Sequence, residues 1–276
     1  VLYTVSCCHE SPDSTLSRTC DATHSPLTMA LKPSNIDTSR FVTPLATSEE
    51  RTAEMSLRPR SLSEYIGQNQ IKEHLKVAIE SAKIRKSSLE HILFYGPAGL
   101  GKTTLYMILA HEMGVGIKHT SGPAIEKQSD IISLLTSITE GEIVFIDEIH
   151  RLRPQIEEVL YSAMEDFQID IMIGAGTGAT SVKMDIPRFT LVGATTKLSN
   201  LTSPLRDRFG NILKLDFYDI ADLEHIVSRS FRALEYIISD QDAIHAVARR
   251  SRGTPRIANR YVKILRDYAI VGKSLT

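Results

Sequence analysis

The segment Gly96-Pro97-Ala98-Gly99-Leu100-Gly101-Lys102-Thr103-Thr104 constrains the fold of this chain more than any other feature. It satisfies the pattern GxxxxGK[ST], follows an apolar stretch typical of a strand, and precedes a helix pattern. Glycine lets the backbone turn so that successive N–H groups face phosphate oxygens, and the following helix N-terminus favours the same anion. Lys102 can reach the β- and γ-phosphates, and the Thr103 hydroxyl can bind Mg²⁺. The segment therefore predicts a nucleoside triphosphate site.

A pair of acids follows a second apolar run. Ile143–Ile146 is uninterrupted, which predicts a strand buried on both faces, and Asp147 and Glu148 come directly after it. Ligands of parallel sheets bind at the carboxyl ends of strands. We expect Asp147 to hold Mg²⁺ through water and Glu148 to polarise the attacking water. His150 completes the string DEIH, for which we expect a packing or hydrogen-bonding role and no catalytic role.

Strand and helix patterns alternate up to about residue 218, which predicts an α/β fold with a P-loop αβα parallel sheet. The expected strands span 91–95, 143–147, 190–194 and 212–217, and expected helices include 69–86 and 154–166. Beyond Asp219 the patterns are helical only, at about 220–236, 239–250 and 256–271, with Asp219 and Ser239 as N-caps and Gly253 as a helix end. We therefore expect a large ATPase domain at 57–218 and a small helical domain at 219–276.

The first part of the chain, residues 1–56, is expected to be a disordered tail. It is rich in Ser and Thr and shows no apolar periodicity, so it cannot bury enough surface to offset its ordering entropy. Zinc binding by its cysteines and histidines is the alternative, although adjacent cysteines do not match a CxxC pair. The candidate zinc ligands are Cys7, Cys8, His9, Cys20 and His24.

Composition excludes several classes of protein. Three cysteines in 276 residues exclude a disulfide scaffold and favour a cytoplasmic setting, and no stretch has the length of a membrane span. The formal net charge is −1, so any surface that binds nucleic acid must be local. The basic residues between Arg249 and Arg266 either form a solvated face or contact DNA phosphates.

The glycine-rich stretch at 174–179 resembles a dinucleotide fingerprint faintly, but no helix pattern follows it. Its flanks, 167–173 and 180–186, alternate between apolar and polar residues, which predicts a β-hairpin. Two of its apolar residues, Ile171 and Ile173, belong either to the core or to an exposed patch that binds a partner, and the pattern leaves both open.

Three further positions are candidates for sensing or completing the nucleotide site. Thr196, at the end of the strand ending in GATT, is a candidate sensor of the γ-phosphate. Arg206 and Arg208 are either surface ion-pair residues or candidates for an arginine finger delivered to a neighbouring subunit, and such head-to-tail contacts close into rings. Arg256 starts the last helix and is a candidate second sensor.

From about Leu57 to Thr276 the chain resembles the RuvB family, the AAA+ motors of Holliday-junction branch migration. The strings SAMEDFQIDIMIG and LTSPLRDRFG are specific to that motor among AAA+ proteins. The remaining shared strings are LRPRSLSEYIGQ, HILFYGPAGLGKTT, VFIDEIHRL, FTLVGATT and RGTPRIANR.

The resemblance implies roles for individual residues. Leu57 and Arg58 would contact the adenine nucleotide, Thr196 would be the first sensor, Arg208 the trans-acting finger and Arg256 the second sensor. Residues implied to cradle the phosphates and Mg²⁺ are Gly99, Gly101, Lys102, Thr103 and Thr104, and residues implied to line or border the nucleotide pocket are Glu165, Asp166, Phe167 and Tyr218.

The resemblance also implies partners. The hairpin at 167–189 would grip the junction-binding protein RuvA, homo-hexameric rings would pump duplex DNA out of the junction, and the RuvC resolvase would act nearby. The family carries a C-terminal winged helix that touches DNA, and the chain stops at Thr276, about where it should begin. Two alternatives remain open at this point: a clamp-loader-like AAA+ switch, and a truncated product that binds nucleotide without motor activity.

Overall fold

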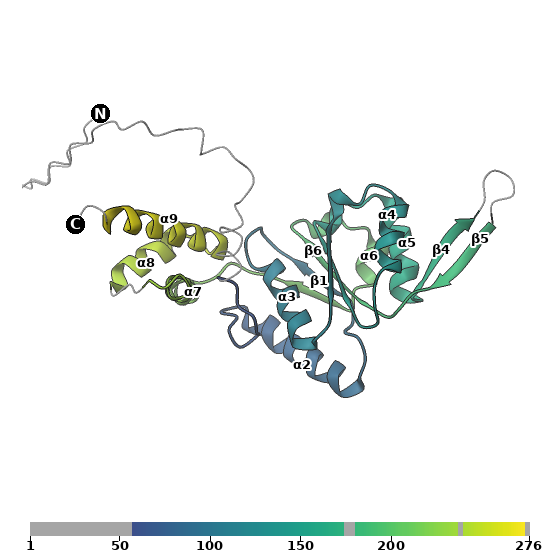
Figure 1. The fold of residues 1–276 in the computed structure, drawn as a ribbon, viewed down its shortest axis with the longest axis horizontal. Coiled ribbons are helices and arrows are strands. Elements are labelled where there is room, and N and C mark those ends of the chain that lie inside the picture. The colour runs from purple at the N-terminus through teal and green to yellow at the C-terminus, as the bar shows by residue number, and fades with distance from the viewer. Residues whose placement is uncertain (1–56, 174–179, 237–239, 274–276) are drawn as a thin grey trace, which may run out of the picture. The chain divides into compact units, whose positions relative to one another are not determined.

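Three apolar runs form the centre of a five-stranded parallel sheet. A computed structural model describes residues 57–173, 180–236 and 240–273, and Figure 1 shows its elements. The strands lie in the order β2-β3-β6-β1-β7, and every pairing between them is parallel. Their bounds are β1 Ile92–Tyr95, β2 Ile117–Ser121, β3 Ile143–Asp147, β6 Thr190–Thr195 and β7 Asn211–Lys214.

The central strands are apolar throughout because helices cover both faces of the sheet. In β3, Phe145 belongs to one core cluster, whereas its neighbours Val144 and Ile146 belong to the other. The first cluster includes residues from α2 (Asn69–Arg85) and α3 (Lys102–Met113). The second includes residues from α4 (Gln128–Thr136), α5 (Pro154–Glu165) and α6 (Ser203–Asp207). The predicted α/β parallel-sheet fold is confirmed.

Strand β2 was absent from the sequence-based prediction. Its residues, Ile-Lys-His-Thr-Ser, form no apolar run, because β2 lies at an edge of the sheet and pairs with β3 alone. Its side chains are exposed or only partly buried. Short 3₁₀ segments complete this part of the fold, η2 at Gly122–Ala124, η3 at Ile149–Arg151 and η5 at Leu198–Asn200.

The predicted hairpin is present as β4 (Gln168–Ile173) and β5 (Thr180–Asp185), an antiparallel pair outside the main sheet (Figure 1). The glycine-rich tip at 174–179 lies outside the described residues. Ile169 is buried in the core, and Ile171 packs against it while partly exposed. Val182, which pairs directly with Ile171, is 44% exposed. The two strands of the hairpin therefore carry apolar side chains from the core to the surface.

Three helices follow the sheet, as predicted, at α7 (Ile220–Ala233), α8 (Gln241–Arg250) and α9 (Pro255–Lys273). Asp219 caps α7 by accepting the Asp222 N–H at 2.7 Å, which confirms that N-cap. The cap of α8 is Asp240 rather than the predicted Ser239, since the Asp240 carboxylate accepts two N–H groups of the first turn. The α8 helix ends at Arg250, and Gly253 stands beyond it at φ +75° in the turn that leads to α9.

Candidate nucleotide-binding site

The phosphate loop connects β1 to α3 and requires its glycines. Gly96, Gly99 and Gly101 adopt φ values of +147°, +84° and +101°, a region that side-chain-bearing residues rarely enter. A Cβ on Gly101 would lie 2.6 Å from the Tyr65 hydroxyl, and one on Gly96 would lie 2.5 Å from the Leu215 carbonyl oxygen. The sequence Gly-x-x-Gly-x-Gly thus fits both the backbone conformation and the close packing around this turn.

Lys102 is the first residue of α3 and is buried. Its Nζ donates to the carbonyl oxygens of Gly96 and Pro97 at 2.8 and 2.9 Å, so the side chain lies along the inside of its own loop. Burial lowers the pKa of Lys102, and the charges of Asp147 and Glu148 oppose that shift. A polyanion bound in the loop would add to the same favourable field, because negative charge nearby stabilises the ammonium form.

Sheet order explains how the acids and the candidate sensor meet the loop. Strand β6 lies between β1 and β3, so its carboxyl end stands between the phosphate loop and the Asp147-Glu148 pair. The Thr196 hydroxyl lies 3.4 Å from the Glu148 carboxylate, and the Glu148 N–H donates to the Asp147 carboxylate at 2.9 Å. Glu148 adopts φ +49°, which turns the chain sharply just after the strand.

The helices α7, α8 and α9 form a lid, which reaches the phosphate loop through the start of α9. The Arg256 N–H donates to the Gly99 carbonyl oxygen at 3.3 Å, and a Cβ on Gly99 would lie 2.9 Å from the Arg256 Cβ. On α7, Arg229 donates to the carbonyl oxygens of Leu57 and Glu64 at 3.1 and 2.9 Å. The entry segment before α2 (residues 57–68), the loop and the lid therefore contact one another around one site.

These elements enclose a cavity of about 470 Å³. The predicted residues that line it are Leu57, Arg58, Gly99, Gly101, Lys102, Thr103, Thr104, Asp147, Glu148, Thr196 and Arg256. Its lining includes five cations and two acids, which suits a polyphosphate. A buried lysine at the start of α3 and the side chains of Thr103 and Asp147 in the same lining match the groups that a nucleotide with Mg²⁺ requires.

Sequence reasoning missed a face of α9. Asn259, Arg260 and Lys263 also line the cavity, together with Ala98 and Pro255. The signal was available, because positions 256, 260 and 263 follow the spacing of one helix face. The sequence does not show whether that face of α9 points to the cavity or to solvent, because only tertiary packing determines the orientation of the helix.

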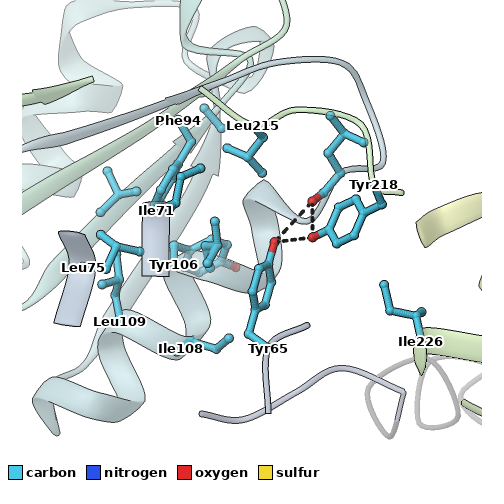
Figure 2. Close-up of a cluster of buried hydrophobic side chains, with 14 of the residues drawn as sticks. Tyr65, Ile71, Leu75, Phe94, Tyr106, Ile108, Leu109, Leu215, Tyr218 and Ile226 are labelled. Carbon is cyan, nitrogen blue, oxygen red and sulfur yellow. Dashed lines mark hydrogen bonds between the residues drawn. The ribbon is translucent and has the colours of Figure 1, made fainter. Parts of the chain in front are cut away.

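Tyr218 lies beneath the loop rather than in the cavity lining. Its hydroxyl donates to the Leu100 carbonyl oxygen at 3.2 Å, so Tyr218 contacts the phosphate loop from below (Figure 2). Glu165, Asp166 and Phe167 are outside the lining of this chain's cavity. Glu165 ends α5 and Asp166 and Phe167 follow it; α5 packs on the face of the sheet opposite α3, and Phe167 packs against Phe189 at the base of the hairpin.

The two candidate finger arginines differ in how they are held. Arg208 pairs with Glu165 at 2.9 Å, donates to the Pro204 carbonyl oxygen at 2.9 Å, and places its guanidinium carbon 4.7 Å from the centre of the Tyr161 ring. Its Nε is buried without a hydrogen-bond partner among the described residues. Arg206 makes a 3.9 Å contact with its neighbour Asp207 and is more exposed. Neither arginine lines the cavity described above.

Among the described residues no cluster of three or more His, Cys, Asp or Glu side chains could hold a metal ion on its own. The candidate zinc ligands between Cys7 and His24 lie outside those residues. Nor does any helix in the described part of the chain have the length and apolar character needed to cross a bilayer.

The parallel sheet, the loop before α3, the acids after β3 and the helical lid together define a P-loop ATPase of the AAA+ type. The family models agree. "Holliday junction DNA helicase RuvB P-loop domain" matches residues 57–215 and "RuvB AAA lid domain" matches residues 218–276. The chain belongs to the RuvB family.

Solved structures of this family are similar to the chain over most of its length. The Thermotoga maritima RuvB Holliday junction branch migration motor is 49% identical, with a TM-score of 0.72, and the match covers 79% of this chain and 68% of that one. A single-residue variant of the Thermotoga maritima protein gives 50% identity with the same TM-score and coverage. The family is one of ATP-hydrolysing branch-migration motors, so the clamp-loader alternative has no support.

Proposed function

We propose that this chain works as the ATP-driven DNA translocase of Holliday-junction branch migration, in a ring of identical subunits that acts together with RuvA. Family membership supports the motor activity. The observation that carries the ring is the position of Arg208, which is fixed by three contacts yet lies outside the cavity that holds the phosphate loop. An arginine finger that its own subunit does not use serves a neighbour's nucleotide.

Within one cavity we assign the following roles. Lys102 neutralises the β- and γ-phosphates, the loop N–H groups bind phosphate oxygens, and Arg256 adds a cation from the lid. Glu148 orients and polarises the attacking water, and Thr196, beside Glu148, contacts the γ-phosphate. Thr103 and Asp147 are the residues that would hold Mg²⁺, which supplies charge neutralisation between the phosphates when bound.

The lid and the sheet act as two parts, a large ATPase domain at 57–218 and a small helical domain at 219–276. The match boundaries at 215 and 218 support this division. Because Arg256 contacts the Gly99 carbonyl, loss of the γ-phosphate would be transmitted to α9 directly. A lid that follows the nucleotide state is what converts hydrolysis into movement between neighbouring subunits.

We assign binding of RuvA to the hairpin at 167–189. Val182 is 44% exposed and sits opposite the partly exposed Ile171, which provides apolar surface away from the nucleotide cavity. Val182→Ser is expected to weaken RuvA binding at least tenfold in a titration. Ile84→Ser on α2, where Ile84 is 83% exposed, is the matched control and is expected to leave it unchanged.

The test of motor activity is strand displacement from a synthetic four-way junction, with and without RuvA, together with ATP turnover. ATP turnover is expected to rise with RuvA and junction DNA, and to collapse for Lys102→Ala and for Asp147→Asn. ATP turnover that does not change on addition of RuvA or junction DNA, together with no strand displacement from the junction, would contradict the motor assignment.

The test of the finger mixes two inactive variants. Subunits with Lys102→Ala retain Arg208, and subunits with Arg208→Ala retain an intact nucleotide cavity. In a mixed ring, some sites therefore combine an intact cavity with Arg208 from the neighbouring subunit. Recovery of ATP turnover in the mixture is expected. Arg206→Ala in place of Arg208→Ala is expected to remain active alone, and the reverse result would transfer the role to Arg206.

A further inference from the structure

His150 lies three residues after Asp147, in η3, and its imidazole contacts Glu148 and Thr195, the last residue of β6. Its Nδ1 lies 2.9 Å from the Thr195 hydroxyl oxygen and 3.3 Å from the Glu148 carboxylate, and its side chain is 9% exposed. We propose that His150 is a positioning residue for ATP hydrolysis, which holds the Glu148 carboxylate toward the attacking water and ties it to the end of β6. The inference rests on the proposed role of Glu148.

The neighbours of Nδ1 determine where its proton lies. A carboxylate can only accept, so the contact with Glu148 is favourable only when Nδ1 carries hydrogen. The Thr195 hydroxyl oxygen already accepts the Lys197 N–H at 3.0 Å and has a second lone pair for the same Nδ1 hydrogen. Both contacts are therefore consistent with His150 as a shared donor between a fixed hydroxyl and the carboxylate.

Thr195 gives His150 a rigid support. It is fully buried as the last residue of β6, and it pairs with Tyr95 of β1. Its carbonyl oxygen accepts the Gly96 N–H at 3.2 Å, which is the first N–H of the phosphate loop. A continuous chain of contacts thus runs from the phosphate loop through Thr195 and His150 to the Glu148 carboxylate.

Glu148 needs such support. Its side chain is 35% exposed, so the surrounding atoms leave the carboxylate room to rotate about its side-chain bonds. The hydrogen bond that Thr196 donates to the Glu148 carboxylate is long at 3.4 Å. Because a misplacement of about 1 Å can cost on the order of 100-fold in rate, a donor that selects one carboxylate position affects turnover more than binding.

The alternative is that His150 only fills space in the core. Two variants of His150 and one control separate this packing role from the proposed positioning role. His150→Leu keeps volume and removes the donor, whereas His150→Asn places an amide N–H near the position of Nδ1. His225→Leu, at an exposed histidine of α7, is the matched control. The readouts are kcat and KM for ATP, the Kd of a fluorescent non-hydrolysable ATP analogue, and the midpoint of thermal unfolding.

The expected result for His150→Leu is a kcat about 10- to 100-fold lower, with the analogue Kd within about threefold of the wild type. His150→Asn is expected to recover most of that loss, and His225→Leu to change nothing. A wild-type kcat in His150→Leu, or an Asn variant as slow as the Leu variant, would overturn the proposal.

Thr195 provides a second measurement if the Leu variant does not fold. Thr195→Val removes the hydroxyl and keeps the backbone bond to Gly96, and is expected to lower kcat several-fold, whereas Thr195→Ser keeps the hydroxyl and the rate. Equal rates for the Val and Ser variants would also overturn the proposal. A wild-type chain without ATP turnover, or one indifferent to Glu148→Gln, would contradict the proposed function instead.

Discussion

The Tyr218 hydroxyl donates a hydrogen bond to the Tyr65 hydroxyl at 2.8 Å beneath the phosphate loop (Figure 2). Tyr65 belongs to the entry segment before α2, and Tyr218 directly precedes the lid. Both hydroxyls also approach the Leu100 carbonyl oxygen, at 3.3 and 3.2 Å. Two segments distant in sequence therefore share one acceptor on the loop that holds the phosphates.

Both tyrosines stay neutral at ordinary pH. Burial raises the pKa of Tyr218 to about 12, and burial together with the neighbouring Tyr218 raises the pKa of Tyr65 well above its usual value of 10.0. Neutral hydroxyls can donate, so the group stays hydrogen-bonded across the range in which the enzyme would work. The pair is accordingly a structural joint between the entry segment, the loop and the lid.

Tyr218→Phe tests this joint. The variant keeps the ring and removes one donor, so the free energy of unfolding is expected to fall by about 1 kcal/mol. Urea unfolding measures the change, with Tyr268→Phe as the control because Tyr268 is 74% exposed. Equal stability of the two variants would show that the hydroxyl pair contributes nothing beyond its burial.

Gly99→Ala tests the contact between loop and lid. The new Cβ would lie 2.9 Å from both Arg256 Cβ and Thr254 Cγ2, at a φ of +84° that itself disfavours alanine by about 1–2 kcal/mol. We expect displacement of the start of α9 and a loss of ATP affinity of about tenfold or more.

Gly114→Ala is the matched control for that prediction. Gly114 has φ +69° at the end of α3, but a Cβ there would meet nothing within 4 Å. It should therefore lose stability in urea and keep its ATP affinity in an equilibrium titration. If both variants bind ATP as the wild type does, close approach of the lid to Gly99 is not required for binding.

His91 predicts a pH dependence of stability. Its Nδ1 accepts the Leu191 N–H at 2.8 Å, and its Nε2 lies 3.1 Å from the Met164 carbonyl oxygen, so the neutral ring fits the site. Burial lowers the pKa of His91 below 6.5, with the Met164 carbonyl opposing that shift. As pH falls below 6.5, the unfolded chain takes up a proton that the folded chain resists. The free energy of unfolding therefore falls as the pH drops from about 6.5 to the pKa of His91 in the folded chain. Above about pH 6.5 this histidine does not affect stability.

The measurement is the free energy of unfolding at pH 7.5 and 5.5. One proton contributes at most about 1.4 kcal/mol per pH unit, and His91→Gln should remove that share of the decrease while lowering stability at both values. His225→Gln, at an exposed position, should keep the wild-type dependence. An unchanged decrease in His91→Gln would assign it to other groups.

The sequence predicted those parts of the site in which local chemistry determines the backbone. The loop from Gly96 to Thr104 and the acids after β3 could be placed because glycine conformations and uninterrupted apolar strands leave few alternatives. The hairpin was predictable for the same reason, since alternation over both flanks of a glycine-rich stretch matches an antiparallel pair.

What sequence reasoning missed depends on packing between distant segments. Strand β2 has no apolar run because it lies at the sheet edge, and only its pairing with β3 identifies it. The link from His150 to Thr195 joins residues that are 45 positions apart, so no local pattern could indicate it. Glu165 matched a pocket position by resemblance, yet in this subunit it pairs with Arg208.

The cavity-facing side of α9 gives the last prediction. Arg260 and Lys263 line the cavity beside Arg256, where Asp147 and Glu148 are the acids in the lining. An ATP phosphate chain is strongly anionic, and cations in one concave site raise its local concentration and its affinity. Arg260→Gln keeps a long polar side chain and removes the charge, so ATP affinity should fall about three- to tenfold. Arg249→Gln makes the same change at an exposed position of α8 and should leave affinity unchanged. Titrations at low and high salt add a second criterion, because the difference between the variants should shrink as screening increases. Equal affinity of the two variants at low salt would mean that Arg260 faces the cavity without acting on the nucleotide.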